Sequence, residues 1–142
     1  MAVSGRNVQA RFGEGMGLQH VAWSGPLEWN GERFVPVALT WKRLEGMEDS
    51  YEVVVQLLDA RGALLAQSDG VPSGGAAPTP EWDRDEDVVD NHLLPLPAQF
   101  PPGEYALVVS AIDPRNAQRL TASGVESGPE RNTALLARLQ VQ

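Results

Sequence analysis

The stretch FVPVALTWKR, residues 34–43, decides the fold class of this chain. Its large apolar side chains fall at every second position: Val35, Val37, Leu39 and Trp41. Alternation with a period of two is typical of a β-strand that buries one face and exposes the other. Pro36 interrupts the stretch and has no N–H to donate to a neighbouring strand. The sequence therefore predicts a strand here, with Pro36 at a sheet edge or at a bulge.

The same alternation recurs on both sides of this stretch, in YEVVVQLLD at residues 51–59 and YALVVSAID at residues 105–113. Weaker versions predict strands at residues 7–12, 18–23, 63–67, 88–96, 119–122 and 135–141. The last of these is rich in helix-forming residues, but its alternating Leu135, Ala137, Leu139 and Val141 favour a strand. We therefore predict an all-β fold, a two-sheet antiparallel immunoglobulin-like sandwich of seven to nine strands.

Length and composition indicate how many domains the chain forms and which kinds of bound group it can hold. A chain of 142 residues has the size of one domain, so residues 1–142 are expected to form a single β-sandwich. Residues 68–82, rich in Gly and Pro, are expected to cross between the two sheets. The chain has no Cys, which excludes disulfides and thiolate zinc sites. No cofactor is expected.

Charge and hydropathy narrow the set of partners. The net charge of −8 opposes binding to a phosphate backbone, so we expect no nucleic-acid partner. No stretch approaches the roughly 20 apolar residues of a membrane span, and direct insertion into a membrane is not expected.

The densest charged feature is EWDRDEDVVD at residues 81–90, which holds six acids and one Arg. Asp83, Asp85 and Asp87 have the alternate spacing of calcium ligands. An EF-hand is excluded, because Val88 stands where its glycine belongs and Leu94 where its bidentate glutamate belongs. A calcium site of another kind and a solvated loop without a ligand remain as alternatives.

An enzymatic function has little support in the sequence. Glycoside hydrolases place two carboxyl groups on opposite sides of a cleft, and neighbours within one acidic stretch seldom reach that geometry. Ser73 lies outside any nucleophile elbow, and neither His20 nor His92 has a recognisable orienting partner in the sequence. We therefore expect a protein without catalytic residues, with a carboxylate-based glycoside hydrolase as the weaker alternative.

Tryptophan supplies the candidate binding residue. An exposed indole is a common stacking surface for a sugar ring, whereas a buried one adds mass to the core. Trp41 is expected in the core, and Trp23 and Trp29 flank a turn that could line one end of the sandwich. Trp82 is the best ligand candidate, because acids that could accept hydroxyl hydrogen bonds surround it. The predicted ligand-binding residues are Trp82, Asp83, Asp85, Asp87 and Asp90. The alternative for Trp82 is a residue that pins the long connection onto the core.

Short segments across nearly the whole chain resemble a domain of bacterial membrane glycosyltransferases. The domain is the β-sandwich that follows the membrane-spanning part of enzymes of the dolichyl-phosphate-mannose mannosyltransferase type. The segments are residues 8–13, 39–41, 51–59, 62–69, Pro72, Gly74, 78–79, Trp82, Glu86, Asp90, 94–97, 102–105, 113–114 and 119–120. This chain departs from the family at Arg84 and Asp85, where a Pro-Gly turn is usual, and between Trp23 and Arg33, where it is shorter.

The resemblance implies an accessory domain to which no catalytic residues are assigned. We expect an interaction module with a glycan or an envelope protein as partner, and the alternative is a structural spacer without a ligand. The expected location is outside the cytoplasm if the domain belongs to a membrane glycosyltransferase, and cytoplasmic if the chain is complete.

Overall fold

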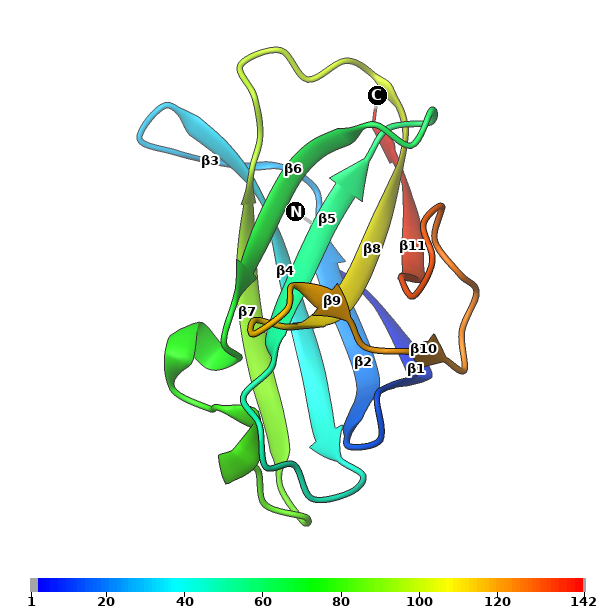
Figure 1. Ribbon diagram of the computed structural model, residues 1–142. Helices are drawn as coiled ribbons and strands as arrows, with labels where there is room; N and C mark the ends of the chain where they lie inside the picture. The colour runs from blue at the N-terminus through cyan, green and yellow to red at the C-terminus, as the bar shows by residue number, and fades with distance from the viewer. Residues whose placement is uncertain (1–2, 142) are drawn as a thin grey trace.

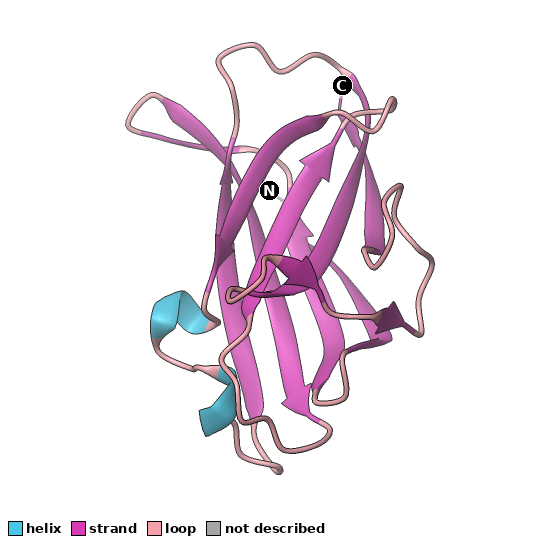
Figure 2. Ribbon diagram, in the orientation of Figure 1, coloured by secondary structure: helices cyan, strands magenta, loops and turns pink. Residues whose placement is uncertain are grey.

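The computed structural model describes residues 3–141 and contains two antiparallel sheets that pack face to face (Figures 1 and 2). The six-stranded sheet has the order β10-β1-β2-β4-β3, with β7 paired to β4, and the five-stranded sheet has the order β11-β8-β5-β6, with β9 paired to β8. The predicted all-β two-sheet sandwich is confirmed. Its immunoglobulin-like character stays a prediction.

Eleven strands and two short 3₁₀ helices make up the described chain. Six strands form the first sheet: β1 (Val3–Phe12), β2 (Met16–Ser24), β3 (Leu27–Trp29), β4 (Glu32–Arg43), β7 (Asp87–Pro95) and β10 (Ala122–Ser123). Five form the second: β5 (Glu52–Leu58), β6 (Leu64–Gly70), β8 (Gly103–Asp113), β9 (Gln118–Arg119) and β11 (Ala134–Val141). The connection from β6 to β7 crosses between the sheets, as expected, and contains η1 (Ser73–Gly75) and η2 (Thr79–Glu81).

The strand count exceeds the predicted seven to nine for two local reasons. Strand β3 pairs with the start of β4 across Asn30 and Gly31, whose φ angles of 52° and 79° fit a type I′ hairpin turn. The single strand expected at residues 119–122 is two short strands, β9 and β10, which pair in different sheets.

Pro36 lies in a central strand rather than at an edge. Strand β2 pairs with β4 as far as Val37, and β3 resumes the pairing at Phe34. Pro36 therefore falls in the gap between β2 and β3, where that side of β4 has no partner that needs an N–H donor. On the other side, β4 pairs with β7 without interruption from Phe34 to Lys42.

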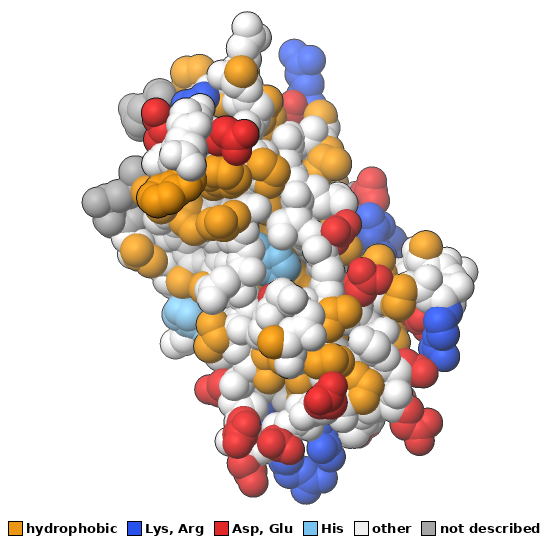
Figure 3. All heavy atoms as spheres, turned by 90° about the vertical axis from the view of Figure 1, so that its left-hand side faces the viewer, with side chains coloured by type: hydrophobic (Ala, Val, Ile, Leu, Met, Phe, Trp, Pro, Cys, Tyr) orange, Lys and Arg blue, Asp and Glu red, His pale blue; other side chains and the backbone are white. Residues whose placement is uncertain are grey.

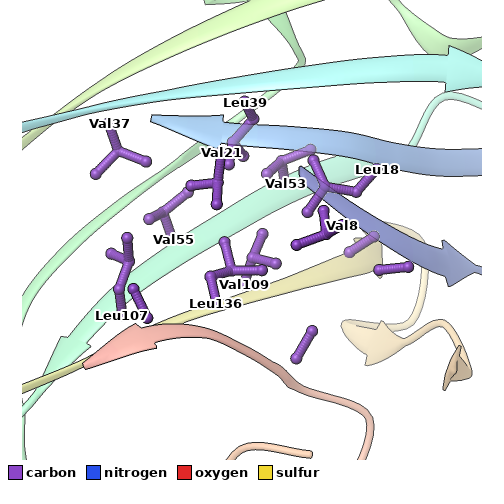
Figure 4. Close-up of a cluster of buried hydrophobic side chains, with 14 of the residues drawn as sticks. Val8, Leu18, Val21, Val37, Leu39, Val53, Val55, Leu107, Val109 and Leu136 are labelled. Carbon is purple, nitrogen blue, oxygen red and sulfur yellow. The ribbon is translucent and has the colours of Figure 1, made fainter. Parts of the chain in front are cut away.

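The core fills the space between the sheets. Val35, Val37, Leu39 and Trp41 all point inward from β4 and are buried, as the alternation of residues 34–43 predicts. Side chains from the opposite sheet, including Val55, Leu107 and Val109, face them (Figure 4). Burial of this aliphatic and aromatic surface is the main stabilising contribution to the fold. No helix within residues 3–141 has both the length and the apolar character needed to cross a membrane.

Candidate functional site

Trp82 does not present a surface to a ligand. It follows η2 in the β6–β7 connection, and only 3% of it is exposed. Its indole packs against Trp41 with 6.0 Å between ring centroids, and its Nε1 donates a hydrogen bond of 2.8 Å to the Ala77 carbonyl. An enclosed indole does not fit the prediction that Trp82 stacks on a ligand. The side chain pins the long connection onto the core, which was the alternative.

The calcium alternative for the acidic segment falls on side chains that are exposed to solvent. Asp83, Asp85 and Asp87 are all exposed, and Asp87 begins β7 opposite Lys42. Within residues 3–141, no three side chains of His, Asp or Glu come together in a way that could hold a metal ion. The acids of residues 83–87 therefore occupy a solvated turn, where repulsion between them is screened by water and salt.

Asp90 belongs to the interior rather than to the acidic turn. It points inward from β7 and is only 1% exposed. Its Oδ1 accepts a hydrogen bond from the Ser73 backbone N–H at 2.9 Å, and its Oδ2 lies 3.4 Å from Trp41 Nε1 and 2.8 Å from His92 Nε2. All of the carboxylate's partners are donors, so a buried charge is compensated without solvent. Asp90 is therefore removed from the set of predicted ligand residues.

His92 extends this network to the other sheet. Asp90 and His92 are two residues apart on β7, so both side chains point inward. His92 Nδ1 lies 2.8 Å from the Ser68 hydroxyl on β6. If the imidazole is neutral and its hydrogen is on Nε2, Nδ1 holds the lone pair and accepts a hydrogen bond from the Ser68 hydroxyl. This series of hydrogen bonds links β7, an edge strand of one sheet, to β6, an edge strand of the other.

The residue types Ser, His and Asp are those of a serine-hydrolase triad, but their placement here is that of a structural link. The imidazole is almost fully enclosed, and Ser68 lies within a regular strand rather than on a sharp turn. A hollow of about 440 Å³ lies beside the network and is lined by residues 68–71, Gly74, Gly75 and 90–92. The pairing of Asp90 with His92 was not predicted from the sequence, although their two-residue spacing on a strand places both side chains on the same face.

The outer face of the six-stranded sheet is a second candidate site, besides the hollow next to the network of Asp90, His92 and Ser68. Pairing registers across β1, β2, β4 and β7 align its outward side chains in three rows. We call these rows the open face: Val3–Ser24 together with Pro36–Leu93, then Gly5–Ala22–Ala38–Asn91, then Asn7–His20–Thr40–Val89. In the first row Ser24 and Pro36 are not paired, but both line the same hollow. None of these residues is Asp, Glu, Lys or Arg.

Large hydrophobic side chains concentrate on the open face and its extension. Within residues 3–141, seven large hydrophobic side chains are exposed, and three of them, Val3, Val89 and Leu93, belong to the open face. Leu27 and Trp29 on β3 extend it, because their cross-strand partners Phe34 and Glu32 share the outward side of β4. Figure 3, which views the side where β3 and β7 lie, shows a group of hydrophobic side chains in its upper half with acidic ones beside it, and further acidic and basic side chains at its lower end.

The open face is hollowed between its first and second rows. A hollow of about 280 Å³ lies between Val3 on one side and Leu93 on the other. Its lining includes Ala22 and Ala38, which belong to the row of small residues. Ser24, Pro36 and Asn91 also line the hollow, whereas no residue of the third row does.

A charged cluster ties together loops at the end of the sandwich. Arg115 binds Asp113 with 2.7 Å between Nη2 and Oδ2, and it binds Asp49 with 3.0 Å between the same types of atom. The hydrogen bond from the Arg115 side chain lowers the pKa of Asp113 below its ordinary value. Burial, followed by the nearby charges of Asp49 and Asp113, raises the pKa of Tyr51.

Comparisons with known proteins leave the chain without an assigned family. No protein-family model matches it, and no curated protein matches it with significant similarity. The resemblance to the accessory domain of membrane glycosyltransferases therefore stays a prediction.

Proposed function

We propose that this chain is a non-catalytic interaction domain that docks another protein surface through the open face. The observation that carries the proposal is the placement of exposed hydrophobic side chains. Of the seven large ones exposed within residues 3–141, five lie on the open face or on its extension at Leu27 and Trp29. Scattered single hydrophobic residues need no explanation on a protein surface, whereas a contiguous patch marks a site of association.

The character of the patch favours a protein partner. Interface centres are depleted in charged residues and enriched in apolar and aromatic ones, which matches the three uncharged rows. The acidic residues 83–87 lie at the start of β7 and just before it, so they border the patch instead of interrupting it. By the sequence resemblance, the partner would be an envelope protein and the domain an accessory part of a larger membrane enzyme.

A photo-crosslinking residue placed at Leu93 tests the proposal in the cells from which the protein comes. We expect a covalent adduct of discrete mass at this position, because the probe would lie inside the interface. Leu64 on β6 is 56% exposed, close to the 60% of Leu93, but lies outside the patch. A probe at Leu64 should therefore give no adduct, and adducts of equal yield at both positions, or at neither, would refute the proposal.

A carbohydrate ligand is the second candidate, and one observation favours it. Trp29, on the β3–β4 hairpin that projects from the sandwich (Figure 1), is 72% exposed. A hollow of about 400 Å³ beside the hairpin is lined by Glu28, Glu32 and Arg33, which could bind sugar hydroxyls. The carbohydrate hypothesis thus moves from Trp82 to Trp29. Titration of a glycan panel should then shift tryptophan emission, and Trp29→Ala should abolish the shift; an unchanged emission across the panel eliminates this candidate.

A further inference from the structure

We propose that a hollow on the outer side of the five-stranded sheet binds the phosphate group of a small molecule. We call it the arginine hollow, and it goes beyond the proposed function because the open face belongs to the other sheet. Its volume of about 570 Å³ falls within the roughly 300–1,000 Å³ of small-molecule sites. It is lined by Val54 on β5, Ser110 and Ile112 on β8, residues 117–119 at β9, and Arg131 and Asn132 before β11.

Ser110 is the residue that points to a ligand. Seven polar or charged residues are buried within residues 3–141, and six of them make side-chain hydrogen bonds: Ser24, Thr79, Asp90, His92, Asp113 and Thr133. Ser110 is the seventh, only 3% exposed, and its hydroxyl has no hydrogen-bond partner in the described part of the chain. Buried polar groups are nearly always hydrogen-bonded, so an exception needs an explanation. Because Ser110 lines the hollow, a group bound there would supply the missing partner.

The charge of the lining favours an anion. The lining contains Arg119 and Arg131 but no Asp or Glu, although the whole chain has a net charge of −8. Arg119 binds Glu130 at 2.6 Å through Nη2 and donates to the Arg131 carbonyl through Nη1, which ties the two walls together. The guanidinium of Arg131 forms no ion pair or hydrogen bond with any residue that the structure describes. Glu52 lies opposite Ile112, on the side away from Arg119, and is not part of the lining.

The set of donors favours a phosphate group over a carboxylate. Asn132 accepts a hydrogen bond from the Ala122 N–H through Oδ1, which leaves its amide N–H groups to donate elsewhere. Together with Gln118, Ser110 and the two arginines, it places donors on both walls and on the floor of the hollow. A phosphate monoester presents three acceptor oxygens and a charge of about −1.5 to −2 at pH 7, which two guanidinium groups match. A flat carboxylate has one charge and two oxygens, and would leave more of these donors unused.

The floor of the hollow gives the ligand an apolar part. Val54 and Ile112 lie on either side of Ser110, because Val54 is opposite Ser110 and Ile112 is two residues further along the same strand. An organic group attached to the phosphate would cover these two side chains and remove apolar surface from water. We therefore expect a phosphate ester to bind more tightly than inorganic phosphate.

A titration of the full chain, labelled with ¹⁵N and followed by NMR, tests the site with phenyl phosphate as the probe. The ionic strength is kept constant with sodium chloride, because salt screens exposed charges. Phenyl phosphate should cause saturable shifts at the backbone amides of Ser110, Gln118 and Asn132, with a Kd on the order of 1 mM. Inorganic phosphate should shift the same amides with a Kd several-fold higher, and phenol, which lacks the phosphate, should give no saturable shift.

Two arginine variants distinguish the site from general attraction to positive charge. Arg131→Gln should raise the Kd for phenyl phosphate at least about tenfold, because it removes a charged donor from the hollow. Arg61→Gln is the matched control, since Arg61 is an exposed arginine at the β5–β6 turn and does not line the hollow. This variant loses the same charge and should leave the Kd unchanged.

Ser110→Ala separates a binding role from a structural one. The hydroxyl makes no hydrogen bond within the described chain, so its removal should leave the Tm unchanged or higher while the Kd rises several-fold. A lower Tm with an unchanged Kd would assign the hydroxyl to the fold and overturn its role in binding.

Three results would overturn the proposal as a whole. The first is the absence of saturable shifts up to about 20 mM phenyl phosphate. The second is equal weakening by Arg131→Gln and Arg61→Gln, which would mean diffuse attraction. The third is co-sedimentation with vesicles of phosphatidylglycerol without any binding of phenyl phosphate, which would assign the arginines to a lipid surface. Cross-linking at Leu93 depends on none of these residues, so the two proposals fail independently.

Discussion

The two outer faces of this sandwich both carry hydrophobic side chains, but these side chains are buried on one face and exposed on the other. On the five-stranded sheet, Leu58, Val108 and Leu135 form a small cluster of their own, and all three are buried. The segment between β10 and β11 lies over this cluster, close enough that a Cβ at Gly128 would stand 3.1 Å from Val108 Cγ1. We call this surface the covered face. On the open face, the corresponding hydrophobic side chains are exposed.

The difference shows which apolar residues the fold needs. Hydrophobic side chains stabilise a protein only to the extent that folding removes them from water. The covered face has its own lid, held by hydrogen bonds from Leu135 N–H to the Glu126 carbonyl and from Gly128 N–H to the Thr133 carbonyl. Leu93 and Val3 gain little from folding, because most of their surface stays exposed. Stability therefore accounts for the covered face but leaves the open face unexplained, which is the reason to look for a partner there.

Placing the same charged residue on each face should give the largest predicted difference in unfolding free energy. Val108→Asp buries a carboxylate at a position that is 1% exposed, and it should cost about 3 kcal/mol or more in unfolding free energy. Leu93→Asp should change the unfolding free energy by no more than about 0.5 kcal/mol.

Urea unfolding of both variants at low protein concentration, where association is negligible, gives the two values. Equal losses for Val108→Asp and Leu93→Asp would mean that the two faces do not differ as the structure indicates. The midpoint should move with the slope unchanged if both variants retain the native fold.

A smaller loss of stability should come from adding one methyl group under the segment between β10 and β11, which forms the lid of the covered face. Gly128→Ala places a Cβ against Thr133 Oγ1 and Val108, so the segment must lift away from the sheet. Overpacking of this kind costs about 1–3 kcal/mol. Gly46→Ala is the matched control, because a Cβ there meets only the end of the Arg43 side chain and neither glycine has a positive φ. Thermal unfolding should show a lower Tm for Gly128→Ala and an unchanged or higher Tm for Gly46→Ala.

Much of the fold could be predicted from sequence because one signal, the period-two alternation, is local. Residues 34–43, 51–59 and 105–113 coincide with β4, β5 and β8 to within two residues. Strand β3 was missed because three residues are too few for alternation to appear, although Asn30-Gly31 is a known hairpin signal. The division of residues 119–122 between two sheets depends on distant partners, which alternation does not specify.

The candidate site was harder to predict, because exposure is a property of the tertiary structure. Trp82 and Asp90 lie in an acidic, polar stretch, yet both are buried by the way the β6–β7 connection folds onto the core. The partner of His92, Ser68, comes from another sheet and 24 residues earlier in the chain. Val89 and Leu93 break the polar alternation on the outward side of β7, and this was the available signal for the open face.

The smallest predicted effect is a change in Tm at low pH, and it comes from the cluster of Asp113, Arg115 and Asp49. This cluster lies at the β8–β9 turn, on the side of the five-stranded sheet. Arg115 lowers the pKa of Asp113, so this carboxylate favours the folded state at pH values above its unfolded pKa of about 3.9. The contribution is lost as the pH falls through the lower folded pKa. Thermal unfolding from pH 6 down to about pH 2 should therefore show a decrease in Tm below about pH 4 that is shallower in Asp113→Asn. Arg115→Gln should reduce the slope to a similar extent, and the double variant should add little, because both changes remove one interaction. If the slope of Asp113→Asn equals that of the unchanged protein, the cluster does not stabilise this side of the sandwich.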